Sequence, residues 1–295
     1  MPTPFDDDYE LDLGTTYAMV QRIVEAGVSN GRGVIKMGSA LGEGTMLRDT
    51  EWPALLRTAV RAADGKVPIM SAIHYKDTVR AIEDAKIAAD LGAAAIQITP
   101  AIHNDPSQQD HYDYFYDISN AVDVGIMVYH TKWFNGGEIE VDTFLRMADI
   151  DNVVAIKWPG SAEDGSYEPM RKFTDRFNVI DNTASPVNCI RNGGHGYVQT
   201  VLDANPEHEL KVWDLIQEGK LDEAEKLYDS VYDDIKEMYQ LVSKRTGGQS
   251  LVFKALSVIV GHPLGPPRPP SKPLNDEEME QLRGKVRSWG WEVKG

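Results

Sequence analysis

The sequence predicts an α/β protein, a (β/α)8 TIM barrel with a C-terminal helical extension. Short apolar, β-rich runs alternate with longer amphipathic ones up to about residue 204, which is the rhythm of parallel strands joined by helices. No GxGxxG fingerprint of a dinucleotide-binding sheet follows any of these runs, so a barrel is favoured over a doubly wound sheet. Beyond residue 204 only helical patterns remain.

The predicted strands share one pattern, because each is apolar on both faces, as parallel strands covered by helices should be. Seven runs have it: 33–38, 68–73, 94–99, 125–130, 153–158, 178–181 and 196–201. The stretch "PTPF" at 2–5 offers the stub of an eighth strand, which would complete the barrel.

The predicted helices lie between the strands, with helical period at 50–63, 77–92 and 141–149. Asp77 and Thr78 are suited to begin the second of these helices, and Gly92 is suited to end it. Further helices follow residue 204, and the proline-rich stretch 262–274 separates the last two. We therefore expect a barrel over 1–204 and C-terminal helices over 205–295, packed on the barrel.

Composition excludes several classes of function. The 295 residues carry 46 acidic and 30 basic side chains, a formal charge of −16 that would repel nucleic acids and anionic membranes. No apolar run approaches the ~20 residues of a membrane span, and the N-terminus lacks the pattern of a signal peptide. The lone Cys189 favours neither a disulfide nor a structural zinc site. We expect a soluble, cytoplasmic protein that binds neither nucleic acid nor membranes.

Polar residues gather where the predicted strands end, and in a βα barrel the active site lies at that edge. These residues are Ser39, Glu43, His74, Thr99, Tyr129, His130, Lys157, Asp181 and Asn182. Lys157 follows the apolar run 153–156, where desolvation would lower the pKa of an amine toward neutrality. A neutral amine attacks carbonyl carbons and forms a Schiff base. The alternative is a lysine that snorkels or pairs with Asp181 or Glu43.

Tyr129 ends the strand that precedes the one carrying Lys157, so the two side chains should be neighbours. A phenol beside a Schiff-base lysine could carry protons to and from the substrate oxygen. The alternative is a core tyrosine whose hydroxyl is hydrogen-bonded.

Six short motifs run almost from end to end of the chain: "PTPF" at 2–5, "GSALGE" at 38–43, "ITP" at 98–100, "VYH" at 128–130, "AIKW" at 155–158 and "GGHGYVQTV" at 193–201. In their order and spacing the chain resembles the dihydrodipicolinate synthase / N-acetylneuraminate lyase superfamily, the pyruvate-type class I aldolases. The resemblance implies that Lys157 is the Schiff-base lysine and Tyr129 the proton relay. It also implies no cofactor, no metal and a homotetramer built from dimers.

Departures from the family pattern indicate that the chain is not a true dihydrodipicolinate synthase. The hydroxyl pair that holds the substrate carboxylate in many members falls on Ser39 and Ala40 or on Ala40 and Leu41, so the carboxylate would depend on backbone N–H groups and Ser39. The stretch 100–106 lacks the aromatic relay residue of those synthases, and 129–137 lacks their arginine.

Aromatic residues near the predicted site suggest an apolar or aromatic aldehyde partner. These are Trp133 and Phe134 in the loop after the tyrosine strand, and Trp158 beside the lysine, with Leu41 opposite. The same aromatics could equally be packing under the loops. The candidate substrate-binding residues are Ser39, Ala40, Leu41, His130, Trp133, Trp158 and Asn182.

The hypothesis that follows is a Schiff-base lyase that cleaves or forms an aldol bond next to a 2-oxo acid such as pyruvate. A Schiff-base dehydratase or hydratase-aldolase shares the same intermediate and stays open. Two other classes are weaker: a metal-dependent barrel hydrolase and a catalytically silent barrel. The hydrolase would use His74, His103 and His130 together with Glu43 or Asp105.

Overall fold

The structure is a computed structural model that describes residues 1–101, 105–131, 137–161, 165–182 and 185–294. Its chain forms two compact units. One unit combines residues 1–67 with 200–295, and the other contains residues 68–199. Each is described by itself below.

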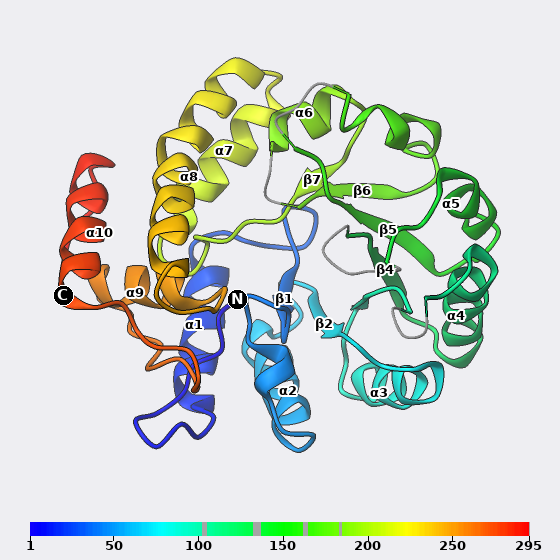
Figure 1. Ribbon diagram of the computed structural model, residues 1–295, viewed down its shortest axis with the longest axis horizontal. Helices are drawn as coiled ribbons and strands as arrows, with labels where there is room; N and C mark the ends of the chain where they lie inside the picture. The colour runs from blue at the N-terminus through cyan, green and yellow to red at the C-terminus, as the bar shows by residue number, and fades with distance from the viewer. Residues whose placement is uncertain (102–104, 132–136, 162–164, 183–184, 295) are drawn as a thin grey trace. The chain divides into compact units, whose positions relative to one another are not determined.

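The unit of residues 68–199 is a parallel sheet covered by helices (Figure 1). Its strands are neighbours in chain order: β2 (Ile69–Ile73), β3 (Ala95–Ile98), β4 (Gly125–Tyr129), β5 (Val153–Trp158), β6 (Asn178–Asp181) and β7 (Gly196–Tyr197). Its helices are α3 (Thr78–Asp90), α4 (Gln108–Ala121), α5 (Val141–Met147), the short 3₁₀ helix η2 (Glu168–Lys172) and α6 (Pro186–Arg191). The helices lie on the outer side of the curved sheet, as α/β layering requires.

Local sequence signals explain where these elements begin. The Asp77 side chain accepts hydrogen bonds from the N–H groups of Val79 and Arg80 and so begins α3. Ser107 and Asp110 form a reciprocal capping box that begins α4. The strands are β-branched and largely buried, so the sheet holds its register through side chains packed on both faces.

The unit of residues 1–67 and 200–295 is mostly helical. Its elements are α1 (Leu13–Glu25), β1 (Ile35–Met37), the 3₁₀ helix η1 (Gly44–Met46), α2 (Glu51–Ala63), α7 (Pro206–Gln217), α8 (Leu221–Ser243), α9 (Leu251–Ile259) and α10 (Asp276–Ser288). Helix α1 packs on α2, and α8 packs on α7, α9 and α10. A capping box of Asn275 and Glu278 begins α10.

The predicted α/β class and the helical C-terminal region are confirmed, and all seven predicted strands are present. The stub at 2–5 is not a strand, because the chain turns back at Asp6–Glu10 and Phe5 forms only an isolated antiparallel bridge with Leu11. The last strand ends at Tyr197 and not at residue 201 as predicted. The predicted domain boundary at residue 204 stays a prediction. Within the described ranges, no helix has the length and apolar character that crossing a membrane requires.

Candidate active site

Lys157 and Tyr129 are cross-strand partners at the carboxyl ends of β5 and β4. Lys157 is 7% exposed, and its Nζ lies 4.0 Å from the centroid of the Tyr129 ring. Residues paired across parallel strands project from the same face of the sheet, so the register itself brings the amine onto the phenol ring. The neighbourhood predicted from the sequence is therefore present in the fold.

The Tyr129 phenol is buried and hydrogen-bonded at the same time. Burial raises the pKa of Tyr129, hydrogen bonds to the side chains of Asn182 and Thr131 oppose that shift, and the nearby Tyr75 phenol adds to it. A phenol with a raised pKa keeps its proton at neutral pH, and the two hydrogen bonds fix the direction of its oxygen. In this protonated form the phenol can donate a proton to a neighbouring group.

A backbone hydrogen bond to β5 positions Asn182 beside the Tyr129 phenol. Its N–H donates to the carbonyl of Trp158 over 2.9 Å, which extends the β5–β6 ladder by one residue. Successive residues of an extended strand point to opposite faces, so Asn182 and Asp181 diverge. Asn182 was predicted to contact substrate, and its side chain also hydrogen-bonds to the Tyr129 phenol.

Asp181 points away from Lys157 and belongs to a buried polar cluster behind the strand. The Tyr167 hydroxyl donates to its Oδ1 over 2.5 Å. Burial, and then the Asp181 carboxylate, raise the pKa of both the Tyr167 phenol and the Cys189 thiol. A Cβ on Gly160 would lie 2.0 Å from Cζ of Tyr167, so only glycine allows this tyrosine to reach Asp181. The cluster supports the strand end and leaves Cys189 as an unreactive thiol.

Trp158 and His130 lie in an aromatic cluster with Phe144 and Phe173. The His130 ring is 4.9 Å from Trp158 and 5.2 Å from Phe144, and Trp158 is 5.7 Å from Phe173. The indole N–H of Trp158 donates to the carbonyl of Ser166. These contacts favour the packing interpretation of Trp158 and His130 over the predicted substrate contact.

The other predicted substrate residues are in different parts of the chain. Ser39, Ala40 and Leu41 belong to the unit of residues 1–67 and 200–295, in the turn between β1 and η1. Ser39 is buried there, and its carbonyl accepts the N–H of Gly44 over 3.0 Å. Trp133 lies outside the described residues, as does Phe134.

Three residues near Tyr129 were not predicted as site residues. Thr131 hydrogen-bonds to the phenol, and Tyr75 lies close enough to affect its pKa. Tyr75 has a left-handed backbone with φ of 60°, a conformation rare for a bulky residue, and its N–H donates to Thr99 Oγ1 over 3.1 Å. The third is Gln97, whose Nε2 lies 2.9 Å from Nε2 of His74, and the His74 ring centroid is 5.7 Å from that of Tyr129. A glutamine inside an apolar run was the one signal available in the sequence.

The predicted metal-site alternative has no support from the geometry. In the ranges that the structure describes, no group of three histidine, cysteine, aspartate or glutamate side chains converges as metal ligands would. The His74 ring is bonded to Gln97, and His130 is packed among aromatic rings. His103, the third histidine of that hypothesis, lies outside the described residues.

Solved structures with the same fold include a dihydrodipicolinate synthase of Bacillus anthracis, with a TM-score of 0.86 at 26% identity over 98% of this chain and 96% of that one. The structure of YagE, a prophage protein of Escherichia coli in complex with pyruvate, has a TM-score of 0.87 at 22% identity, covering 98% and 96% of the two chains. At that identity the second likeness is one of fold alone.

Curated relatives cover most of the chain. A 4-hydroxy-tetrahydrodipicolinate synthase of Halalkalibacterium halodurans is 27% identical over 96% of this chain and 92% of its own length. A synthase of the same name from Chlorobium chlorochromatii is 30% identical over 77% and 76% of the two chains. The family model described as "Dihydrodipicolinate synthetase family" matches residues 1–288. Members of this family are Schiff-base lyases of the class I aldolase type, which act on pyruvate-type substrates. The chain is an enzyme of this lyase class and belongs to the dihydrodipicolinate synthetase family.

Proposed function

We propose that this protein is a Schiff-base lyase in which Lys157 condenses with a 2-oxo acid such as pyruvate and Tyr129 relays the protons. The observation that carries the proposal is the pairing of the two residues across β4 and β5, with the amine 4.0 Å from the centre of the phenol ring. In a family whose members use this chemistry, a buried amine against a hydrogen-bonded phenol has a direct chemical role.

The proposed reaction begins with attack of the Lys157 nitrogen on the keto carbon of the acid. The resulting carbinolamine loses one water to form an iminium ion, and the Tyr129 phenol supplies the proton that makes hydroxide leave as water. The Tyr129 phenolate left by that step takes a proton from C3, which turns the iminium ion into an enamine. The enamine carbon then bonds to an aldehyde carbon, the aldehyde oxygen takes up a proton, and one water hydrolyses the product from the lysine.

The substrate carboxylate is proposed to bind the turn of residues 38–43. Its ligands would be backbone N–H groups and the Ser39 hydroxyl, because the hydroxyl pair of many relatives is reduced to Ser39 with Ala40, or to Ala40 with Leu41. A carboxylate held by N–H groups forms charge-assisted hydrogen bonds, which are stronger than neutral ones.

The natural reaction is proposed to differ from that of the synthases to which the chain is similar. The stretch 100–106 has no tyrosine and 129–137 no arginine, at the places where those synthases carry an aromatic relay residue and an arginine. An apolar or aromatic aldehyde is the proposed partner, and the support for it is Trp133, Phe134 and Leu41 in the sequence. Trp158 no longer contributes, because it lies among Phe144 and Phe173.

A dehydratase or hydratase-aldolase is the second candidate, since it proceeds through the same iminium ion. Product analysis separates the two: an aldolase releases or consumes an aldehyde, whereas a dehydratase releases water from a hydroxylated 2-oxo acid and leaves its carbon chain intact. We further propose a TIM-barrel-like fold, a cytoplasmic location and a homotetramer, because family members usually form tetramers.

The proposal is tested by incubating the protein with pyruvate and a panel of other 2-oxo acids in the presence of borohydride. A Schiff base on Lys157 is reduced to a stable secondary amine, so the intact mass increases permanently. We expect the gain in the wild-type protein and its loss in Lys157→Ala. Absence of an adduct with every 2-oxo acid, or an undiminished adduct in Lys157→Ala, would contradict the proposal.

A further inference from the structure

The turn of residues 38–44 has a tightly constrained backbone. The Thr3 hydroxyl donates to the carbonyl of Gly42 over 2.6 Å, and the N–H of Gly44 donates to the carbonyl of Ser39. A Cβ on Gly44 would lie 1.7 Å from the carbonyl oxygen of Gly38, so the turn closes on itself too tightly for any other residue. The backbone groups of such a turn keep a single geometry as long as the two ends of the turn are fixed.

Glu43, at the end of this turn, is held by a buried ion pair. Its backbone is left-handed, with φ of 53°, and such a conformation in a residue other than glycine persists only when surrounding contacts enforce it. Its Oε2 lies 3.0 Å from Nζ of Lys254 in α9, and both side chains are only 4% exposed. Lys254 also donates to the carbonyl of Pro266 over 2.8 Å.

The electrostatics of this pair favour a positioning role over a stabilising one. Burial lowers the pKa of Lys254, and the neighbouring Glu43 carboxylate opposes that shift. The cost of removing two charges from water largely cancels their attraction, and buried pairs therefore add little net stability. Such a pair instead selects one geometry for the two segments that carry the charges.

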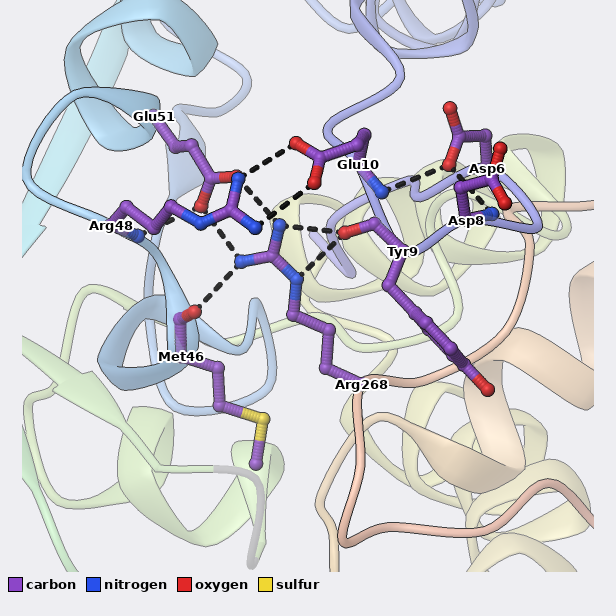
Figure 2. Close-up of polar contacts among 8 residues, drawn as sticks. All are labelled: Asp6, Asp8, Tyr9, Glu10, Met46, Arg48, Glu51 and Arg268. Atoms are coloured by element: carbon purple, nitrogen blue, oxygen red, sulfur yellow. Dashed lines mark hydrogen bonds and ion pairs between the residues drawn. The ribbon is translucent and has the colours of Figure 1, made fainter.

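A second cation, Arg268, contacts the chain just after the turn, at Met46 and Glu51. The centroid of the Phe5 ring lies 4.5 Å from Lys254 Nζ and 4.2 Å from Arg268 Cζ. Figure 2 shows the Arg268 guanidinium between the carbonyls of Met46 and Tyr9 and the Glu51 carboxylate, with distances of 2.8, 2.7 and 2.6 Å. Lys254 and Arg268, which both follow α8 in the chain, therefore contact the two ends of the segment 43–51, at Glu43 and Glu51.

We propose that Lys254 is a positioning residue for 2-oxo acid binding: through its ion pair with Glu43 it holds the turn of residues 38–43 in the geometry that receives the substrate carboxylate. This inference rests on the proposed function, because it takes the turn to be the carboxylate site. Lys254 acts through Glu43 and not on the reacting atoms. Its loss should therefore weaken the binding of the 2-oxo acid much more than it slows the chemistry at Lys157.

The test measures borohydride trapping of the full-length protein over a range of pyruvate concentrations. Lys254→Met and Glu43→Gln are made singly and together, because the double variant leaves no unpaired buried charge and so retains the fold if a single variant does not. Hydrogen bonds to a carboxylate are stronger than those between neutral groups, so even partial misplacement should raise the half-saturating pyruvate concentration about tenfold. The trapping rate at saturation should change less than about twofold, and Lys254→Arg should restore most of the affinity.

Arg245→Met is the control: Arg245 follows α8, its guanidinium pairs with the Glu278 carboxylate of α10, and its side chain is 32% exposed. It should lower the unfolding free energy without changing the half-saturating concentration. Wild-type-like half-saturation in the folded double variant overturns the inference, as does an equal change in the control. Failure of the proposed function is distinct, because the wild-type protein itself would then form no adduct.

Discussion

Replacing Asn182 by alanine tests how the relay tyrosine is oriented. The Tyr129 phenol has hydrogen bonds to two side chains, Asn182 and Thr131, and the substitution removes one of them while the other remains. A neutral hydrogen bond contributes ~1 kcal/mol, and 1.36 kcal/mol is a factor of ten in rate, so we expect Asn182→Ala to slow proton relay about fivefold. Tyr129→Phe removes the relay itself and should slow it by about 10²-fold or more.

The pH dependence of Asn182→Ala has a defined sign. The hydrogen bond from Asn182 lowers the pKa of Tyr129, against the larger effect of burial, which raises it. Removing Asn182 therefore raises the pKa of Tyr129 further, and the alkaline loss of activity should move to higher pH. A shift to lower pH would mean that Asn182 does not stabilise the phenolate.

The assay is exchange of the pyruvate methyl protons with deuterated solvent, followed by NMR, because it reports the iminium–enamine step without knowledge of the aldehyde. Asn178→Ala is the control: Asn178 begins the same strand and its side chain reaches only the carbonyl of Val154. We expect its exchange rate to match the wild type. An unchanged rate in Asn182→Ala beside a slow Tyr129→Phe would refute the orienting role, and a wild-type rate in Tyr129→Phe would refute the relay.

Three other outcomes follow from the structure. Tyr167→Phe removes the hydrogen bond to the buried Asp181 and should lower the unfolding free energy in urea by about 2 kcal/mol; a change below about 0.5 kcal/mol would contradict the role of this contact. Burial lowers the pKa of His208 from 6.5 to about 4, so the unfolded chain binds more protons between these values and stability falls as the pH drops through them. Relative to His208→Phe, the wild-type protein should lose about 3 kcal/mol from pH 7 to pH 4, and parallel curves would refute the assignment. Exhaustive chelation should leave pyruvate adduct formation unchanged, whereas its loss would revive the metal-site hypothesis.

The fold could be predicted from the sequence where one local signal decides the structure. Runs such as 153–158 are apolar and β-branched on both faces, and a helix cap such as Asp77 is read from neighbouring residues. The prediction of a strand at 2–5 was wrong because the conformation of this segment depends on the following turn at 6–10, where Tyr9 adopts a left-handed backbone. The predicted strand length was also wrong at β7, because the apolar pattern continues to residue 201 whereas the strand ends at Tyr197.

The site could be predicted only in part, for geometric reasons. The contact between Lys157 and Tyr129 follows from strand order, but Trp158 lies next to Lys157 in sequence and projects from the opposite face. Strand alternation alone would have placed it among the helices. The ion pair of Glu43 with Lys254 joins residues far apart in the chain, and no spacing or composition signal connects them.

The most direct test of the account is the position of the reduced pyruvate adduct, determined by peptide mass spectrometry. The chain offers a competing amine in β1, because burial lowers the pKa of Lys36 to about 8 and much of it is therefore neutral in mildly alkaline solution. A lowered pKa alone would place the adduct on Lys36. The account predicts that the adduct lies on the peptide containing Lys157 at every pH, unchanged in Lys36→Met. An adduct on Lys36, or one that persists in Lys157→Ala, would contradict it.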